Sequence, residues 1–159
     1  MSVSEVALSG LIGERFVVLT DHRAPGARAA FPAIAIGPAG IFVIEEHRAH
    51  GRIRVRRDVP FLGKEAVPGV TQRVRRHALA LQLLLGDALS GTGLRVTPVL
   101  WVREARVGLR RLVGGVQLQT DRSLRAALRR ARAVLPEADV ADLIRLAEAR
   151  LIPLETKSA

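Results

Sequence analysis

The sequence of 159 residues contains no cysteine, no tyrosine and a single tryptophan. Without cysteine the chain can form no disulfide and no thiolate metal site. Four phenylalanines and one tryptophan are too few to form a row of stacking platforms for single-stranded nucleic acid. No apolar run approaches the ~18 residues that span a bilayer, and the first residues lack a basic region followed by an apolar core. We therefore expect a cytoplasmic protein without a membrane segment.

The sequence also has only two lysines, Lys64 and Lys157. Lys+Arg total 25 against 15 Asp+Glu, so nearly all of the positive charge behind the net +10 is arginine. The bidentate guanidinium suits phosphate oxygens and favours a nucleic-acid partner, although a solvated basic surface without a ligand gives the same composition. The length and the 48% apolar content predict one domain, over residues 1–152, and a disordered tail over 153–159.

Two short apolar runs, 34–36 and 41–44, flank the sequence Gly37-Pro38-Ala39-Gly40. Proline at the second place and glycine at the fourth suit a type I turn, so this stretch predicts a tight β-hairpin. The second run has no polar residue between its large side chains, which favours a central strand covered on both faces. We place the end of this strand, and a candidate site, at the polar cluster that follows it. The cluster consists of Glu45, Glu46, His47, Arg48 and His50.

Hydrophobic periodicity predicts the other elements. We expect helices over 4–12, 70–85, 122–132 and 136–151, strands over 16–20, 31–36, 41–45, 52–57, 96–102 and 117–119, and a basic, irregular segment over 103–111. In the strand 52–57, Arg52, Arg54 and Arg56 share one face at a spacing of ~6.6 Å, close to two steps along a nucleic-acid strand. These three arginines, with Arg73 and Arg76 on the following helix, are the candidate nucleic-acid-binding groups.

The hairpin also carries a family resemblance. The run from Gly37 to Glu45, followed by His47 and Gly51, resembles the core of the nuclease-related domain (NERD) family, a branch of the restriction-endonuclease-like PD-(D/E)XK nucleases. The likeness extends over roughly residues 5 to 150. The resemblance implies a single α/β domain of the restriction-endonuclease-like type, with a mixed central β-sheet and flanking helices.

By this resemblance, three positions should carry the chemistry. In the family, an Asp of the first hairpin strand and an acid of the second hold Mg²⁺, and a Lys two residues later orients the attacking water. The residues at these positions here are Pro32, Glu45 and His47. Pro32 offers no ligand to Mg²⁺, and His47 can act as a base but not as the permanent cation that Lys supplies. The family's acid on the first helix corresponds to Glu5 or Glu14.

The polar residues also have plainer interpretations. Glu45 can be a solvated acid at a strand end. With His47 and His50 it could instead hold a transition metal such as Zn²⁺ or Mn²⁺, although two loop histidines are usually polar surface. Gln72 faces the family's cleft or is an ordinary exposed helical residue. Trp101 lies within an apolar run, so we expect it in the core rather than stacked on a base.

Two functional hypotheses from different classes follow. The first is a catalytically inactive nuclease-like domain without a cofactor, which binds nucleic acid or assists a protein partner. The second is a nuclease dependent on Mg²⁺ or Mn²⁺, with a rearranged site built from Glu45, His47 and one of Glu5, Glu14 or Asp21. A protein-interaction domain that ignores nucleic acid is a third possibility.

Overall fold

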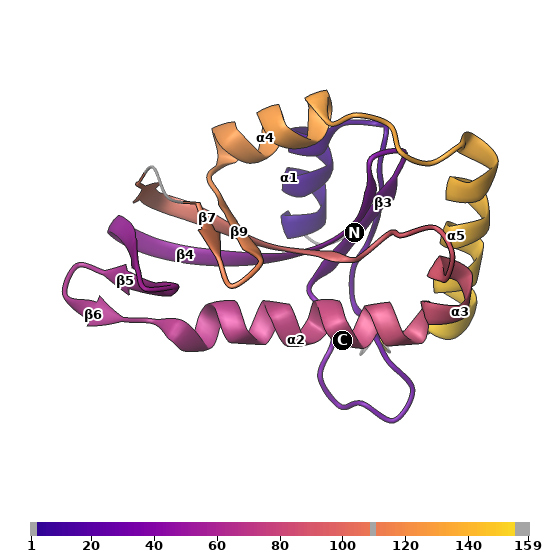
Figure 1. Cartoon of the computed structure of the whole chain (residues 1–159), viewed down its shortest axis with the longest axis horizontal. Helices are drawn as coiled ribbons and strands as arrows, with labels where there is room; N and C mark the ends of the chain where they lie inside the picture. The colour runs from indigo at the N-terminus through magenta and orange to yellow at the C-terminus, as the bar shows by residue number, and fades with distance from the viewer. Residues whose placement is uncertain (1–2, 109–110, 155–159) are drawn as a thin grey trace.

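One mixed β-sheet runs through the molecule, with helices on both of its faces (Figure 1). The computed structural model describes residues 3–108 and 111–154. The predicted fold class, a single α/β domain with a mixed central sheet and flanking helices, is confirmed. The helices are α1 (Val3–Ile12), α2 (Pro68–Leu84), α3 (Gly86–Leu89), α4 (Asp121–Arg130) and α5 (Glu137–Arg150). The strands are β1 (Val17–Leu19), β2 (His22–Arg23), β3 (Ala33–Gly37), β4 (Gly40–Arg56), β5 (Val59–Leu62), β6 (Glu65–Ala66), β7 (Thr97–Val107), β8 (Leu112–Val113), β9 (Val116–Gln119) and β10 (Ile152–Pro153).

The strands of the main sheet lie in the order β1-β3-β4-β7-β9-β8. β4 and β7 pair in parallel, as do β7 and β9, whereas β1, β3 and β4 form an antiparallel meander. β5 pairs with the last residues of β4, and β6 pairs with β5. β2 pairs with β10 in a separate small sheet. A parallel connection needs a crossover, and α2 with α3 provides it between β4 and β7.

Alternating side chains of β4 fill two separate cores, one on each face of the sheet. Ile41 and Val43 pack on the side of α2 and α5, whereas Phe42 and Ile44 pack on the side of α1 and α4. The expectation that both faces of this strand are covered is therefore confirmed. Trp101 is 1% exposed in the second core, as predicted, and its indole N–H donates to Asp121 at 2.6 Å.

β4 and β7 are both longer than the sequence predicted. β4 spans 17 residues, so the predicted strands 41–45 and 52–57 are one strand, and Glu45 lies in its middle instead of at its end. β7 continues to Val107, so the prediction of an irregular segment from 103 is wrong for residues 103–107. The two polar segments pair with each other, and this backbone ladder maintains the strands where the apolar periodicity has ended.

The last helices follow the predicted pattern with small shifts. Thr120 caps α4: its hydroxyl accepts from the Ser123 N–H, and the Ser123 hydroxyl accepts from the Thr120 N–H. After α5 the chain pairs with β2 through Ile152 and Pro153, and the Leu154 N–H donates to the Asp21 carbonyl at 2.7 Å. Residues 155–159, the rest of the predicted tail, lie outside the described residues. No helix within 3–108 and 111–154 is long and apolar enough to cross a bilayer.

Candidate functional site

The hairpin of β3 and β4 brings two of the predicted site positions together. Ala33 pairs with Ile44, so the next residues outward, Pro32 and Glu45, are neighbours at the open end of the hairpin. Pro32 has no N–H to give to a β-ladder, and β3 begins one residue after it. The position where the resemblance expects an aspartate therefore does lie beside Glu45, but it carries no oxygen ligand.

A cavity of about 480 Å³ opens beside Glu45. Its polar lining comes from the loop after β1, from β4 and from α2, and consists of Thr20, Asp21, Glu45, Glu46, Arg73 and His77. Glu5 approaches this cavity as well, because its carboxylate accepts from the Thr20 hydroxyl at 2.7 Å. Glu14 is exposed beyond the end of α1. Of the two acids left open by the sequence, Glu5 is therefore the one that reaches the site.

Arg73 holds the central carboxylate of this cavity. Its Nε donates to Glu45 Oε1 at 2.6 Å. The Glu45 side chain is 15% exposed and that of Arg73 is 51% exposed, so the acid lies well inside the edge of the protein. The other oxygen, Oε2, is buried and has no hydrogen-bond partner among the described residues. The guanidinium thus supplies the positive charge that a divalent cation supplies in a metal-dependent site. Arg73, predicted on an open basic face, is part of an ion pair.

Pro32, His47 and His50 do not join Glu45 in a metal centre. Pro32 supplies no oxygen, and His47 is half-buried on β4 but does not line the cavity. His50 is 89% exposed, and its Nε2 lies 3.6 Å from the Glu104 carboxylate instead of near Glu45. Within residues 3–108 and 111–154, no group of three or more His, Asp or Glu side chains is placed to hold a metal ion.

Glu46 also lines the cavity, but neither it nor Gln72 takes part in the Glu45–Arg73 ion pair. Glu46 accepts from Arg48 and Arg103, each at 3.2 Å, on the opposite face of β4, as alternation along the strand predicts. Gln72 is exposed on α2. The plainer interpretation of Gln72, an exposed helical residue, matches this placement.

His77 is a member of the cavity that the sequence did not single out. It lies one helical turn beyond Arg73, and its ring is 5.5 Å from that of Phe31. Burial lowers the pKa of His77 from its ordinary 6.5; the Glu45 carboxylate opposes this shift, and Arg73 and Arg76 add to it. The four-residue spacing from Arg73 was the one signal in the sequence that could have placed His77 here.

Replacing His77 with glutamine should flatten the pH dependence of stability. Because the folded-state pKa of His77 is lowered, the unfolded chain takes up a proton before the folded protein does. The free energy of unfolding should therefore fall as the pH drops below 6.5, by at most about 1.4 kcal/mol per pH unit for one proton. Urea unfolding of both proteins between about pH 5 and pH 7.5 measures this. Equal slopes in the two proteins would contradict the assignment.

Glu45 and Arg73 should be energetically coupled. We expect Glu45→Gln and Arg73→Gln each to lower the free energy of unfolding, and the double variant to lose less than the sum. A coupling of about 1–2 kcal/mol is expected, because the acid is mostly buried while the exposed half of Arg73 is screened by water. Urea unfolding of the four proteins completes the cycle. Strict additivity would show that the ion pair contributes nothing.

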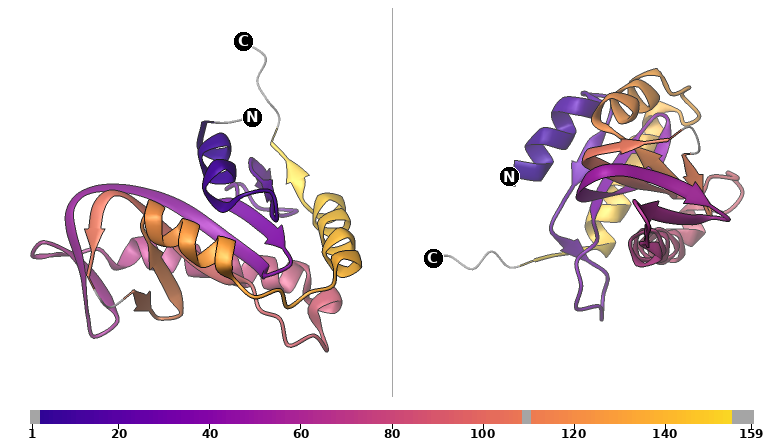
Figure 2. Two further views of the ribbon diagram at one scale, coloured as in Figure 1. Left: turned by 90° about the horizontal axis from the view of Figure 1, so that it is seen from above. Right: turned by 90° about the vertical axis from the view of Figure 1, so that its left-hand side faces the viewer.

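The candidate nucleic-acid-binding arginines lie on two different faces. Ile53 and Val55 pack into the core on the side of α2. Alternation then puts Arg52, Arg54 and Arg56 on the opposite side, where all three are exposed; we call them the arginine face. The far ends of β4 and β7 extend past α4 there (Figures 1 and 2). No described acidic side chain forms an ion pair with any of the three.

Arg73 and Arg76 belong to α2, on the other side of the sheet, so the five predicted arginines do not make one surface. Both side chains are exposed, but Arg73 is paired with Glu45, which leaves Arg76 as the one of the two without an ion pair to a described acidic side chain.

Comparison of the chain with protein-family models, with curated proteins and with solved structures found no match.

Proposed function

We propose that this chain is a nuclease-like domain, of the kind its hairpin resembles, that has no catalytic metal centre and binds nucleic acid through the arginine face. Arg52, Arg54 and Arg56 are the observation that carries the proposal: three exposed guanidinium groups on one strand face, without an acidic partner among the described residues. Guanidinium groups in such a row attract phosphates without reading bases, so binding is independent of sequence.

The site beside Glu45 supports the inactive half of the proposal. Metal-dependent cleavage needs a cation that activates water and offsets charge on the scissile phosphate. Here Arg73 occupies Glu45 Oε1, and Pro32 stands where the resemblance expects the second carboxylate. A domain of this kind serves as a binding or accessory module beside another protein.

Fluorescence anisotropy with labelled duplexes tests the binding. We expect a duplex of about 20 base pairs to bind at low salt, with an affinity that falls steeply and linearly on a log–log plot as salt rises. DNA duplexes of unrelated sequence should bind alike. Failure to bind any duplex at low salt would contradict the proposal and favour a protein-interaction domain that does not bind nucleic acid.

One observation favours the competing hypothesis of a metal-dependent nuclease. The buried Oε2 of Glu45 has no hydrogen-bond partner among the described residues, and Asp21 lines the same cavity. Titration of the protein with Mn²⁺, followed by electron paramagnetic resonance, distinguishes the hypotheses. Our proposal predicts the same weak uptake by the wild type and by Glu45→Ala. Tight uptake by the wild type that is lost in the variant would establish a metal site.

A further inference from the structure

Arg106 is a second arginine directly beside Arg52. In the parallel pairing of β4 with β7, these two residues are in register. Adjacent strands lie ~4.8 Å apart, and like charges opposite one another destabilise a sheet. Both side chains are exposed, and neither forms an ion pair with an acid among residues 3–108 and 111–154. The repulsion within this pair is therefore not compensated inside the described part of the chain.

An irregularity in β7 places Arg106 on this face. Trp101 packs into the core on the side of α4, whereas Ala105 and Val107 pack on the side of α2. Strict alternation from Trp101 would have put all three on one face and Arg106 on the other. The change occurs at Glu104, which has a φ of 64°, where the register with β4 also shifts. A positive φ is uncommon outside glycine, and bulges of this kind re-aim side chains near binding sites.

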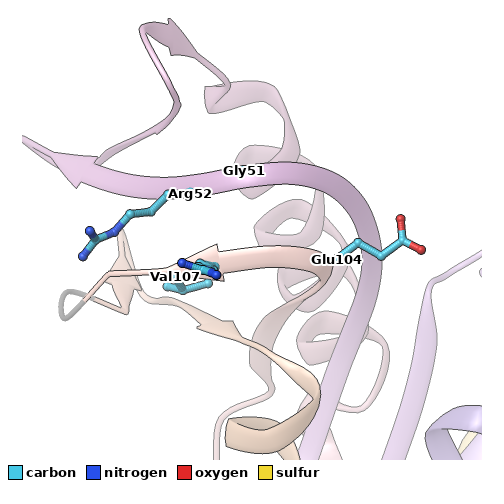
Figure 3. Close-up of a pocket in the computed structure, with 5 residues that line it drawn as sticks. Gly51, Arg52, Glu104 and Val107 are labelled. Carbon is cyan, nitrogen blue, oxygen red and sulfur yellow. The ribbon is translucent and has the colours of Figure 1, made fainter.

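The acid that lines the same cavity, Glu104, does not form an ion pair with either arginine. A cavity of about 640 Å³ lies at the pair, lined by Gly51, Arg52, Glu104, Arg106 and Val107. Figure 3 shows Arg52 and Glu104 extending toward opposite sides. Glu104 is next to His50 instead, with 3.6 Å between its carboxylate and the imidazole Nε2.

We propose that Arg52 and Arg106 together form a site for a single phosphate group, assembled by the bulge at Glu104. Two arginines in register on neighbouring strands can both donate N–H groups to the oxygens of one anion, and the bound charge then relieves their repulsion. The inference rests on the proposed function in one respect, because it takes the phosphate to be part of a nucleic-acid backbone. Arg54 and Arg56 then contact the phosphates that follow along β4.

The first experiment uses inorganic phosphate as the probe, so that it does not depend on nucleic acid. The Nε–Hε resonances of the arginines are followed by nuclear magnetic resonance while phosphate replaces chloride at constant ionic strength. We expect the resonances of Arg52 and Arg106 to shift together along one saturating curve. The exposed Arg95, on the other side of the sheet near α2, is the control and should not follow that curve.

The second experiment is a double-mutant cycle on duplex binding. Arg52→Gln and Arg106→Gln should each weaken binding by about fivefold. If the two arginines share one phosphate, the double variant should also be weakened by only about five- to tenfold, well short of the product of the single effects. Arg95→Gln, which removes one charge elsewhere, measures the loss due to net charge alone.

The two experiments separate this inference from the proposed function. Joint phosphate shifts together with a non-additive cycle support both. Joint shifts without any duplex binding keep the phosphate site and reject the nucleic-acid function. Duplex binding with additive losses, or without joint shifts, keeps the function and overturns the shared site. Neither duplex binding nor joint shifts overturns both.

Discussion

Changing Arg52, Arg54 and Arg56 together to glutamine should weaken binding to a duplex of about 20 base pairs by about 100-fold at low salt. Each arginine of the arginine face is exposed and without an acidic partner in the described chain, so each is available to a phosphate. A surface contact of this kind contributes about 1 kcal/mol, and three of them multiply to about two orders of magnitude. Fluorescence anisotropy against the wild type measures the loss.

The control for this variant has the same net charge. Arg28→Gln, Arg95→Gln and Arg145→Gln remove three exposed arginines from other parts of the surface. If binding depends on the arginine face, this control loses only the general attraction due to net charge, a few-fold at most. Equal losses in the two triple variants would show that total charge, and not this strand face, drives the binding.

Gly37→Ala should be the most destabilising single methyl addition in the hairpin, with a loss of about 3 kcal/mol in the free energy of unfolding. A Cβ at residue 37 would lie 2.6 Å from the backbone carbonyl oxygen of Arg15 and 2.7 Å from the ring of Phe16. A main-chain atom and a buried ring cannot both move aside without disturbing the pairing of β1 with β3. The first glycine of the Gly-Pro-Ala-Gly motif is therefore needed because a larger side chain would not fit there, independent of any catalytic role.

Gly10→Ala is the matched control for this prediction. Gly10 lies in α1, and an added Cβ would meet no atom within 4 Å. Alanine is the better helix former by about 1 kcal/mol, so this variant should be neutral or slightly more stable than the wild type. Urea unfolding of both variants provides the comparison. A Gly37→Ala protein as stable as the Gly10→Ala protein would contradict the close packing of β3 against residues 15 and 16.

Much of the fold could be read from local patterns. The hairpin, the helix after it and the alternation of Ile53 and Val55 with arginines are each encoded within a few residues, so the sequence predicted them correctly. The length of β4 and β7 could not be read in the same way. Their polar halves are strands because they pair with each other, and that contact joins residues far apart in the chain.

The candidate site was less predictable, for the same reason. The resemblance assigned Pro32 and Glu45 to one site, and the register of the hairpin in the structure does put them side by side. The sequence could not place Arg73 on Glu45, because that ion pair depends on how α2 crosses the sheet. The sequence did not single out Arg106 either. Strict alternation along β7 predicts one face of the sheet for Arg106, but beyond the bulge at Glu104 it lies on the other face.

The central claim is binding without cutting, and one measurement tests it directly. End-labelled duplex is incubated with the protein in the presence of Mg²⁺ or Mn²⁺, and the bound fraction and the length of the DNA are determined in the same sample. The account predicts that the duplex is bound and keeps its full length. Shortened products that disappear with Glu45→Ala, or a duplex that stays unbound at low salt, would contradict it.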